Sequence, residues 1–458
     1  MTTIIPTDKA LAVNPIKVSQ PMGATLAFLG IAAAMPLEHG AQGCTAFSKA
    51  FFTRHFREPI PLQTTAMDHL VTIVGSDNNV ITALKNVADI NRPEVIGLVT
   101  TGLTETQGAD IGRTIKEFRT AHPRHANIAV VPVGTPDTEG CLESGFALAV
   151  EAMVATLVPE SNRVGHRPRQ VNVLASAMLT PGDVQAIGEW IEAFDLDPVI
   201  LPDLGDAMDG HLEELGYSTL TAGGTPRWCI AMMGESVATL VIGKSMHRAA
   251  DLLQRRTAVP DFRFDSLMGL EACDAFTATL RRIAGSLVPK RIERQRAQLR
   301  DAMVDCHLQF GGTRVAIAAD PDLLASLVRF FASIGIEPVA AVAAARSGVL
   351  AELPIESVLI GDLEDLERNA RAADVDLLVA NSHAAEAARR LGLPLLRAGF
   401  PLYDQFGGFA RRWVGYAGSR QAIFDAANLI VGKRREIAPY RSIYWQGTSR
   451  ATETATLH

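Results

Sequence analysis

Short runs of β-branched residues alternate with helical stretches along most of this chain of 458 residues. Val95–Thr101, Gln170–Ser176 and Thr313–Ala319 are three such runs, and each is predicted to be a buried strand. A polar or Gly/Pro-containing turn follows each run, and then comes a stretch of about ten to fifteen residues with helical periodicity. Strands and helices that alternate in this way are typical of parallel sheets covered by helices, so we predict an α/β fold.

The pattern starts afresh near residues 170 and 313, which predicts three Rossmann-like domains. Each domain would be a mainly parallel sheet flanked by helices, and the chain is long enough for three at about 150 residues per domain. We place an N-terminal domain at residues 1–165, a second at 166–290 and a third at 291–458. The third would include the long polar linking helix Lys290–Phe310 and an amphipathic helix after Gly418. The two ends, Met1–Gln20 and Thr448–His458, are expected to be irregular. The remaining predicted strands are Val71–Ser76, Ile128–Val133, Pro198–Leu201, Trp228–Met233, Ala238–Ile242, Pro338–Ala344, Ser357–Ile360, Val375–Ala380 and Pro394–Arg397.

The charge balance and the hydropathy pattern argue against several classes of protein. The formal net charge is −7 and the isoelectric point is near 5.9, whereas a nucleic-acid-binding domain is usually basic. The best candidate for a membrane span, Ala24–Leu37, is too short to cross a bilayer and contains Pro36. Met1–Gln20 lacks the charged segment and the apolar run of a secretory signal. We therefore expect a cytoplasmic protein whose partners are neither nucleic acids nor membranes.

Two phosphate-binding motifs are incomplete or missing. Gly243-Lys244-Ser245 resembles the end of a P-loop, but the residue five positions before Gly243, where the motif needs glycine, is Ala238. No GxGxxG follows any predicted strand, so a dinucleotide-binding site is not indicated either. Three acids, Asp362, Glu364 and Asp365, come directly after a predicted strand, and we interpret them as the start of a helix.

The five cysteines are widely spaced, and no two of them form a CxxC pair. This spacing argues against a zinc knuckle and against an iron–sulfur site held by this chain alone. An odd number of cysteines in a reducing compartment also argues against a disulfide framework. We expect Cys229, Cys273 and Cys306 to be small buried side chains.

Cys44 stands in a different context and is the candidate metal ligand. The apolar stretch Thr25–Met35 is predicted to be a helix that Pro36 ends. The next motif is His39-Gly40-Ala41-Gln42-Gly43-Cys44, in which Gly40 and Gly43 flank the approach to the thiol. Glycines let the main chain come close to a bulky anionic group and point N–H donors at it. An iron–sulfur cluster is such a group, and a buried thiol at a turn is the alternative.

Several of these segments together resemble the β-type subunits of the nitrogenase component 1 family. The resemblance spans nearly the whole chain, and its N-terminal motifs are the most specific. It rests on Gln20-Pro21-Met22-Gly23-Ala24, on HGAQGC at 39–44, on RHFREP at 54–59, on VPVGTP at 131–136, on DVDLL at 374–378 and on Gly399-Phe400-Pro401. The fold that it implies is three Rossmann-like domains arranged as in nitrogenase component 1.

The resemblance also implies a set of metal ligands. The β subunit of the catalytic molybdenum–iron protein supplies three cysteines to an eight-iron cluster at its interface with the α subunit. Cys44 stands at one of these positions, whereas Ser19 and Gly102 replace the other two. Cys141 falls near a serine that can bind the eight-iron cluster in one redox state. One thiolate cannot hold a four-iron cluster, which takes about four, so the others must come from a partner chain.

This ligand pattern resembles that of the β-like half of a scaffold that matures the iron–molybdenum cofactor. The resemblance implies an α2β2 heterotetramer with an α-like scaffold subunit that donates three cysteines to a shared [4Fe–4S] cluster. The α-like subunit would hold the cofactor precursor, the nitrogenase iron protein would dock transiently, and apo-nitrogenase would accept the cofactor. No catalytic or cofactor-ligating residue, and no independent catalysis, is expected on this chain.

Two other functions stay open. One is a catalytic β-type subunit, either of nitrogenase or of dark-operative protochlorophyllide reductase. The loss of ligands at Ser19 and Gly102 weighs against nitrogenase. The other is a small-ligand or sugar-nucleotide enzyme on stacked Rossmann-like domains, which the fold would permit although no phosphate motif supports it.

Overall fold

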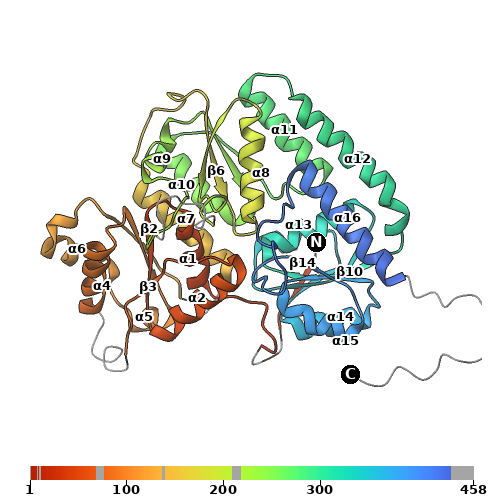
Figure 1. Ribbon diagram of the computed structural model, residues 1–458, viewed down its shortest axis with the longest axis horizontal. Helices are drawn as coiled ribbons and strands as arrows, with labels where there is room; N and C mark the ends of the chain where they lie inside the picture. Colours follow the sequence, from red (N-terminus) through yellow and green to blue (C-terminus); the bar gives the residue numbers. More distant parts are fainter. Residues whose placement is uncertain are drawn as a thin grey trace, which may run out of the picture.

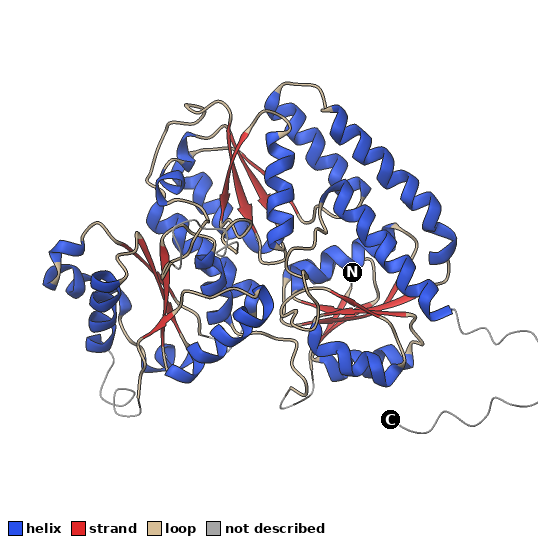
Figure 2. Cartoon of the chain, viewed as in Figure 1, coloured by secondary structure: helices blue, strands red, loops and turns tan. Residues whose placement is uncertain are grey.

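The computed structural model describes residues 2–7, 9, 12–68, 77–136, 140–208 and 218–434. Within these ranges the strands form three sheets, and every strand pair is parallel. Helices cover the sheets, and the three sheets lie around a common centre (Figures 1 and 2). The predicted α/β fold is thereby confirmed. Where one domain ends and the next begins stays a prediction.

The first sheet has the strand order β3-β2-β4-β5. The predicted strands at 95–101 and 128–133 are confirmed as β4 and β5, and Val71–Ser76 lies outside the described residues. The strands are β2 (Ala34–His39), β3 (Gln63–Thr64), β4 (Val95–Thr100) and β5 (Ala129–Val133). The helices around them are α1 (Gln20–Leu29), α2 (Gln42–Phe56), α4 (Asp77–Ile90), α5 (Gly102–Gln107), α6 (Ile111–Ala121) and α7 (Leu142–Leu157).

The predicted helix Thr25–Met35 is wrong in both its bounds. The helix begins earlier, at Gln20, and ends at Leu29, and the apolar residues that follow form strand β2. Pro36 therefore lies inside a strand instead of ending a helix. It is tolerated because β3 pairs only with Leu37 and Glu38, so that Pro36 has a strand partner on one side alone, at Gly97 of β4. Periodicity could not separate the two elements because both are buried on all sides.

The second sheet has the order β7-β6-β8-β9. The predicted strand Trp228–Met233 is wrong, because this apolar run forms the short helix α9 and a turn of 3-10 helix. Pro226 starts that helix by accepting the Cys229 N–H at 2.9 Å, and β9, which was not predicted, takes the edge of the sheet. The elements are β6 (Gln170–Ala175), β7 (Asp197–Leu201), β8 (Ala238–Ile242), β9 (Asp261–Phe264), α8 (Pro181–Glu192), α9 (Arg227–Ala231), η4 (Lys244–Met246), α10 (His247–Thr257) and α11 (Leu270–Ala284).

The third sheet has the order β1-β12-β11-β10-β13-β14. Its edge strand β1 comes from the start of the chain, where we expected irregular structure, and pairs Thr3 with Ser357. The predicted helix Lys290–Phe310 is confirmed as α12, and the helix predicted after Gly418 is α16, which runs beside α12 (Figure 1). The elements are β1 (Thr3–Ile5), β10 (Arg314–Ala319), β11 (Glu337–Ala343), β12 (Ser357–Ile360), β13 (Leu377–Ala380), β14 (Leu395–Arg397), α12 (Lys290–Phe310), α13 (Pro321–Ser333), α14 (Leu363–Ala372), α15 (Ala385–Leu391) and α16 (Gly415–Arg434).

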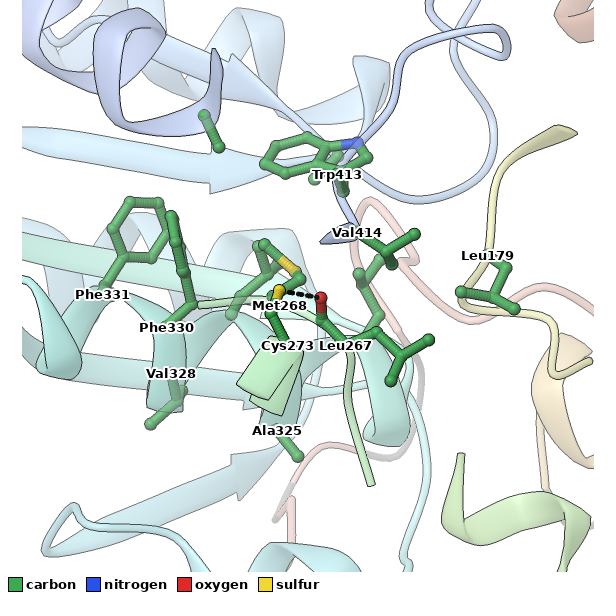
Figure 3. Packing of buried hydrophobic residues seen from close by; sticks show 14 of the residues in the cluster. Leu179, Leu267, Met268, Cys273, Ala325, Val328, Phe330, Phe331, Trp413 and Val414 are labelled. Carbon is green, nitrogen blue, oxygen red and sulfur yellow. Dashed lines mark hydrogen bonds between the residues drawn. The ribbon is translucent and has the colours of Figure 1, made fainter. Parts of the chain in front are cut away.

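The largest hydrophobic core joins the second and third sheets. It combines Trp190 of α8 and Cys273 of α11 with Phe330 and Phe331 of α13 and with Trp413. Figure 3 shows part of this cluster, in which the Cys273 thiol donates to the carbonyl of Leu267 at 3.4 Å. Burial of this shared apolar surface keeps the two sheets together.

Among the helices that the structure describes, none is both long and apolar enough to cross a membrane.

Candidate metal centre

A cavity of about 650 Å³ brings together all three positions that the family resemblance singled out. Ser19, Cys44 and Gly102 line it, and His383 faces them from the third sheet's side of the molecule. These residues lie far apart in the sequence, so their convergence is a result of the fold. Of the five cysteines, all of which are described, Cys44 is the exposed one.

Each of the three positions lies at the start of a helix. Ser19 is the N-cap of α1, Cys44 lies in the first turn of α2, and Gly102 is the first residue of α5. Neither Ser19 nor Ala41, the N-cap of α2, caps its helix with a side chain. The first N–H groups of a helix carry partial positive charge. The cavity therefore suits a negatively charged group, and a thiolate-ligated cluster is negative.

The two glycines before Cys44 have different roles. At Gly40 a Cβ atom would lie 2.6 Å from Oγ1 of Thr101, so a side chain there would push α5 away. The Gly40 N–H donates to Thr65 Oγ1 at 3.2 Å, and Thr101 Oγ1 donates to the His39 carbonyl at 3.0 Å, which fixes this turn. At Gly43, by contrast, nothing lies within 4 Å of such a Cβ. Open space next to the thiol is what a bulky ligand requires.

Two titratable side chains lie behind Cys44. Burial raises the pKa of Glu38, and Thr25 donates to its Oε1 at 3.0 Å. Burial also lowers the pKa of His39 to about 4, so that its ring is neutral at pH 7. The ring nitrogen Nδ1 lies 2.9 Å from Thr65 Oγ1. Neither group brings positive charge, so positive potential at the cavity comes from the helix termini and from Lys17, which also lines it.

The rim of the cavity is apolar and exposed. Phe47 is 62% exposed and Leu103 is 38% exposed, and both line the cavity together with Phe51. The ring centroids of Phe47 and Phe51 are 4.6 Å apart. Large apolar side chains clustered on a surface are typical of a protein–protein contact.

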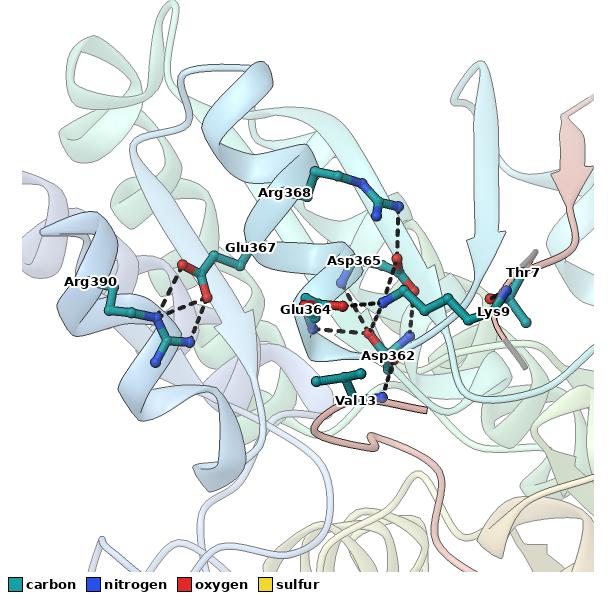
Figure 4. Close-up of polar contacts among 9 residues, drawn as sticks. All are labelled: Thr7, Lys9, Val13, Asp362, Glu364, Asp365, Glu367, Arg368 and Arg390. Carbon is teal, nitrogen blue, oxygen red and sulfur yellow. Dashed lines mark hydrogen bonds and ion pairs between the residues drawn. The ribbon is translucent and has the colours of Figure 1, made fainter. Parts of the chain in front are cut away.

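The N-terminal segment forms another wall, through Pro15, Lys17 and Val18. It is anchored on the start of α14, where Asp362 Oδ2 accepts the Val13 N–H at 2.7 Å (Figure 4). Lys9 forms ion pairs of 2.7 to 3.0 Å with all three acids there. The prediction that these acids start a helix is confirmed, and the three are Asp362, Glu364 and Asp365.

The remaining cysteines lie outside the cavity wall. Cys141 is the buried N-cap of α7, and burial strongly raises the pKa of its thiol. Gln20, whose Nε2 donates to Ser144 Oγ at 2.9 Å, links the start of α1 to the first turn of α7 next to Cys141. Cys273 and Cys306 are buried as expected, whereas Cys229 is only partly buried.

Gly243-Lys244-Ser245 joins two sheets in a way that a phosphate loop would not. Lys244 pairs with Glu352 at 2.5 Å, and the Ser245 N–H donates to Asp322 Oδ2 at 2.9 Å. Both acids belong to the third sheet's part of the chain. The Asp322 carboxylate already accepts the Ser245 N–H, which a phosphate loop would offer to a phosphate group. This agrees with the incomplete P-loop motif in the sequence.

The donor set at the cavity offers one thiolate to an iron–sulfur cluster. Cys44 offers a thiolate, Ser19 offers a hydroxyl that binds iron poorly beside thiolates, and Gly102 offers nothing. Within the described ranges, no three or more His, Cys, Asp or Glu side chains are arranged to hold a metal ion. A cluster at Cys44 would need thiolates from a second chain, and the apolar rim lies where that chain would approach.

Comparisons with known proteins identify the family. The family model "Nitrogenase component 1 type Oxidoreductase" matches residues 19–431. A curated relative from Klebsiella pneumoniae, "Nitrogenase iron-molybdenum cofactor biosynthesis protein NifN", is 48% identical over 99% of this chain and 98% of its own length. A protein of the same name from Bradyrhizobium diazoefficiens is 43% identical over 95% of this chain and 93% of its own.

A solved structure of "Nitrogenase Cp1 at pH 6.5" superposes with a TM-score of 0.88 at 31% identity. It covers 93% of this chain and 95% of the solved chain. The chain therefore belongs to the nitrogenase component 1 type oxidoreductase family, and within that family to the NifN group.

Proposed function

We propose that this chain is the β-like subunit of a scaffold on which the iron–molybdenum cofactor of nitrogenase is made, in the service of nitrogen fixation. Cys44 would supply one ligand to a [4Fe–4S] cluster at the interface with the α-like subunit, NifE. One observation carries the proposal: the exposed Cys44 lines a cavity in which Ser19 and Gly102 occupy the other two ligand positions. The names of the NifN relatives support the wider role in cofactor biosynthesis.

The residues of this chain would act on the cluster by binding it, balancing its charge and keeping water out. The Cys44 thiolate binds one iron atom. The starts of α1 and α2 offset the negative charge of a thiolate-ligated cluster, because the positive ends of both helices line the cavity. Phe47 and Leu103 exclude water once a partner covers them. A bound cluster supplies one-electron transfer chemistry.

The family resemblance implies the partners, and the division of ligands agrees with it. NifE would supply three cysteines and hold the cofactor precursor, and two copies of each chain would form an α2β2 heterotetramer. The nitrogenase iron protein would dock transiently, and apo-nitrogenase would accept the finished cofactor. The exposed apolar rim around Cys44 supports a permanent partner at this face. A single exposed aromatic side chain is common on protein surfaces, whereas a group of adjacent apolar side chains indicates a binding surface.

The test is a Cys44→Ala variant purified as a complex with NifE. We expect the complex to form, because Cys44 is exposed and packs into no core. We expect it to lose about four iron atoms per αβ unit together with the [4Fe–4S] signal in electron paramagnetic resonance. Cys229→Ala is the matched control, because Cys229 is partly exposed on α9 and lies outside the cavity lining. Unchanged iron content and an unchanged signal in Cys44→Ala would refute the proposal.

A further inference from the structure

Two helices begin head to head where the three sheets meet. One is α7, of the first sheet, and the other is α13, of the third. Each helix start is capped by a carboxyl group from the other. The Asp322 N–H in the first turn of α13 donates to Glu143 Oε2 of α7 at 2.7 Å. The carboxyl group of Asp320, the N-cap of α13, faces the first turn of α7, where the Cys141 thiol and the Glu143 N–H partly offset the effect of burial on its pKa.

The second sheet closes the same junction through the turn after β8. The Ser245 N–H donates to Asp322 Oδ2 at 2.9 Å. Gly243 has φ +94°, and a Cβ there would lie 2.8 Å from Asp322 Oδ2 and 2.5 Å from Ser176 Oγ. Only glycine permits this approach. Asp322, which belongs to the third sheet, is thus bonded to the first sheet through its N–H and to the second sheet through its carboxyl group.

This junction contains more negative charge than its surroundings offset. Glu143 is 5% exposed and Asp322 is 1% exposed. Two cations on the neighbouring elements are engaged elsewhere, since Lys244 pairs with Glu352 at 2.5 Å and Arg329 pairs with Asp265 at 2.9 Å. Two helix N-termini together contribute roughly one positive charge, whereas three ionised carboxyl groups would bring three negative charges. Within the described part of the chain, none of the three carboxyl groups forms an ion pair with Lys, Arg or His.

Buried polar atoms at the junction also lack partners. Asp322 Oδ1, Ser176 Oγ and His247 Nε2 have no hydrogen-bond partner among the described residues. His247 does not supply the missing positive charge, because burial lowers its pKa. Burial raises the pKa of Asp320 to about 6, and burial together with the two aspartates raises that of Glu143 further above its usual range. The other titratable groups that face the three acids are Cys141, on α7, and Asp265, after β9.

We propose that Glu143, Asp320 and Asp322 share at least one proton at neutral pH and that this proton locks the three sheets together. When the proton leaves, the carboxylates of Glu143 and Asp322 repel each other and the starts of α7 and α13 separate. This separation would also move the wall of the cavity at Cys44. Ser144, in the first turn of α7, accepts a hydrogen bond from Gln20, and Gln20 follows Ser19 on the cavity wall. The junction is therefore a pH-sensitive latch behind the candidate metal centre.

The sign of the pH dependence follows from linkage. A carboxyl group whose pKa is raised by folding holds its proton in the folded state after the unfolded chain has lost it. The stability that it contributes is complete below the unfolded pKa of about 4.3 and is lost as the pH rises through the folded pKa. For this cluster the window opens near pH 4, where the unfolded carboxyl groups lose their protons, and it closes as the folded groups lose theirs, near pH 6 for Asp320 and at the raised pKa of Glu143.

The experiment compares the wild-type full chain with its Glu143→Gln variant between pH 5 and pH 9. The glutamine keeps an oxygen that accepts the Asp322 N–H and replaces the protonated oxygen by an amide that stays neutral. For the wild type we expect the unfolding constant from urea titrations to rise by up to about tenfold per pH unit for each proton lost. We also expect amide exchange at residues 141–145 and 320–324, corrected for its intrinsic pH dependence, to accelerate in parallel. In Glu143→Gln the unfolding constant and the corrected amide exchange rate should both depend less steeply on pH.

Glu271→Gln is the matched control, because Glu271 lies in the first turn of α11 and is exposed. It should keep the wild-type slope. If Glu143→Gln does not fold, Asp322→Asn gives the same readout, since its amide oxygen can still accept the Ser245 N–H. Equal slopes in wild type and variant would overturn the proposal. Stabilisation by added Mg²⁺ or Mn²⁺ that Glu143→Gln abolishes would overturn it too, because the junction would then hold a cation and not a proton.

Discussion

Two glycines let α1 and α7 touch backbone to backbone, and replacing one of them gives a sharp test of the architecture behind the cavity. A Cβ at Gly145 of α7 would lie 1.9 Å from the carbonyl oxygen of Gln20. A Cβ at Gly23 of α1 would lie 1.9 Å from the carbonyl oxygen of Leu142. Ordinary contacts begin at 3.4 Å, so Gly145→Ala forces the helices apart by the difference of 3.4 and 1.9, or 1.5 Å.

The free energy of unfolding should fall in Gly145→Ala. The obstacle is a backbone oxygen, which cannot rotate away as a side chain can. Overpacking of this kind costs about 1–3 kcal/mol, and a rigid obstacle belongs at the upper end. Alanine in a helix recovers about 0.5–1 kcal/mol relative to glycine. We therefore expect a net loss of about 2 kcal/mol.

Urea denaturation followed by circular dichroism measures this loss. Gly432→Ala is the matched control, because Gly432 lies near the end of α16 with nothing within 4 Å of its Cβ position. The control should gain about 0.5–1 kcal/mol from helix propensity alone. If Gly145→Ala proves as stable as the wild type, the close contact between α1 and α7 does not exist as described. A loss in Gly432→Ala as large as that in Gly145→Ala would also contradict the reasoning.

Two further predictions concern the cavity and the packing of α2. The double substitution Ser19→Cys with Gly102→Cys adds two thiols to the wall that carries Cys44, so the isolated chain should bind more iron after reconstitution with iron and sulfide than the wild type does; equal iron content would contradict the shared cavity. His55 is buried and accepts the Leu402 N–H at 2.9 Å, and burial lowers its pKa to about 3. Because the unfolded chain takes up the proton near pH 6.5, unfolding free energy should fall as the pH drops from about 6.5 towards 3, and His55→Asn should flatten this part of the profile measured by urea titration.

The alternation of strands and helices was enough to predict the α/β fold and most of the elements. Strands such as Gln170–Ala175 and Arg314–Ala319 are short β-branched runs with a turn after them, and they lie where they were expected. Two apolar runs were assigned wrongly. Residues 25–35 divide into a helix and a strand that are buried on every side, so periodicity carries no information there. Residues 228–233 form a helix because Pro226 caps them and β9 takes the sheet edge.

At the candidate centre, the local motif pointed to Cys44, and the family resemblance implied that Ser19 and Gly102 lie beside it, which the shared cavity bears out. The sequence also shows no sign that His383 lines it, since that contact depends on how the third sheet packs. The carboxyl junction was missed altogether. Its members lie about 180 residues apart, and a single sequence does not reveal contacts at that distance. The Asp-Pro pair at 320–321, which starts a helix directly after a strand, was its one local sign.

Strand β1 has a consequence for how the protein is made. It pairs Thr3 with Ser357, so 354 residues must be added after Thr3 before its partner exists. At about 5–20 residues per second, a ribosome needs roughly 18 to 70 s for that length. During this time the residues of β1 lack the strand with which they pair, β12, whereas the first and second sheets can fold without β1. The edge of the third sheet is therefore completed late in synthesis, when β1 pairs with β12. The segment after β1, which forms one wall of the Cys44 cavity, is placed only then.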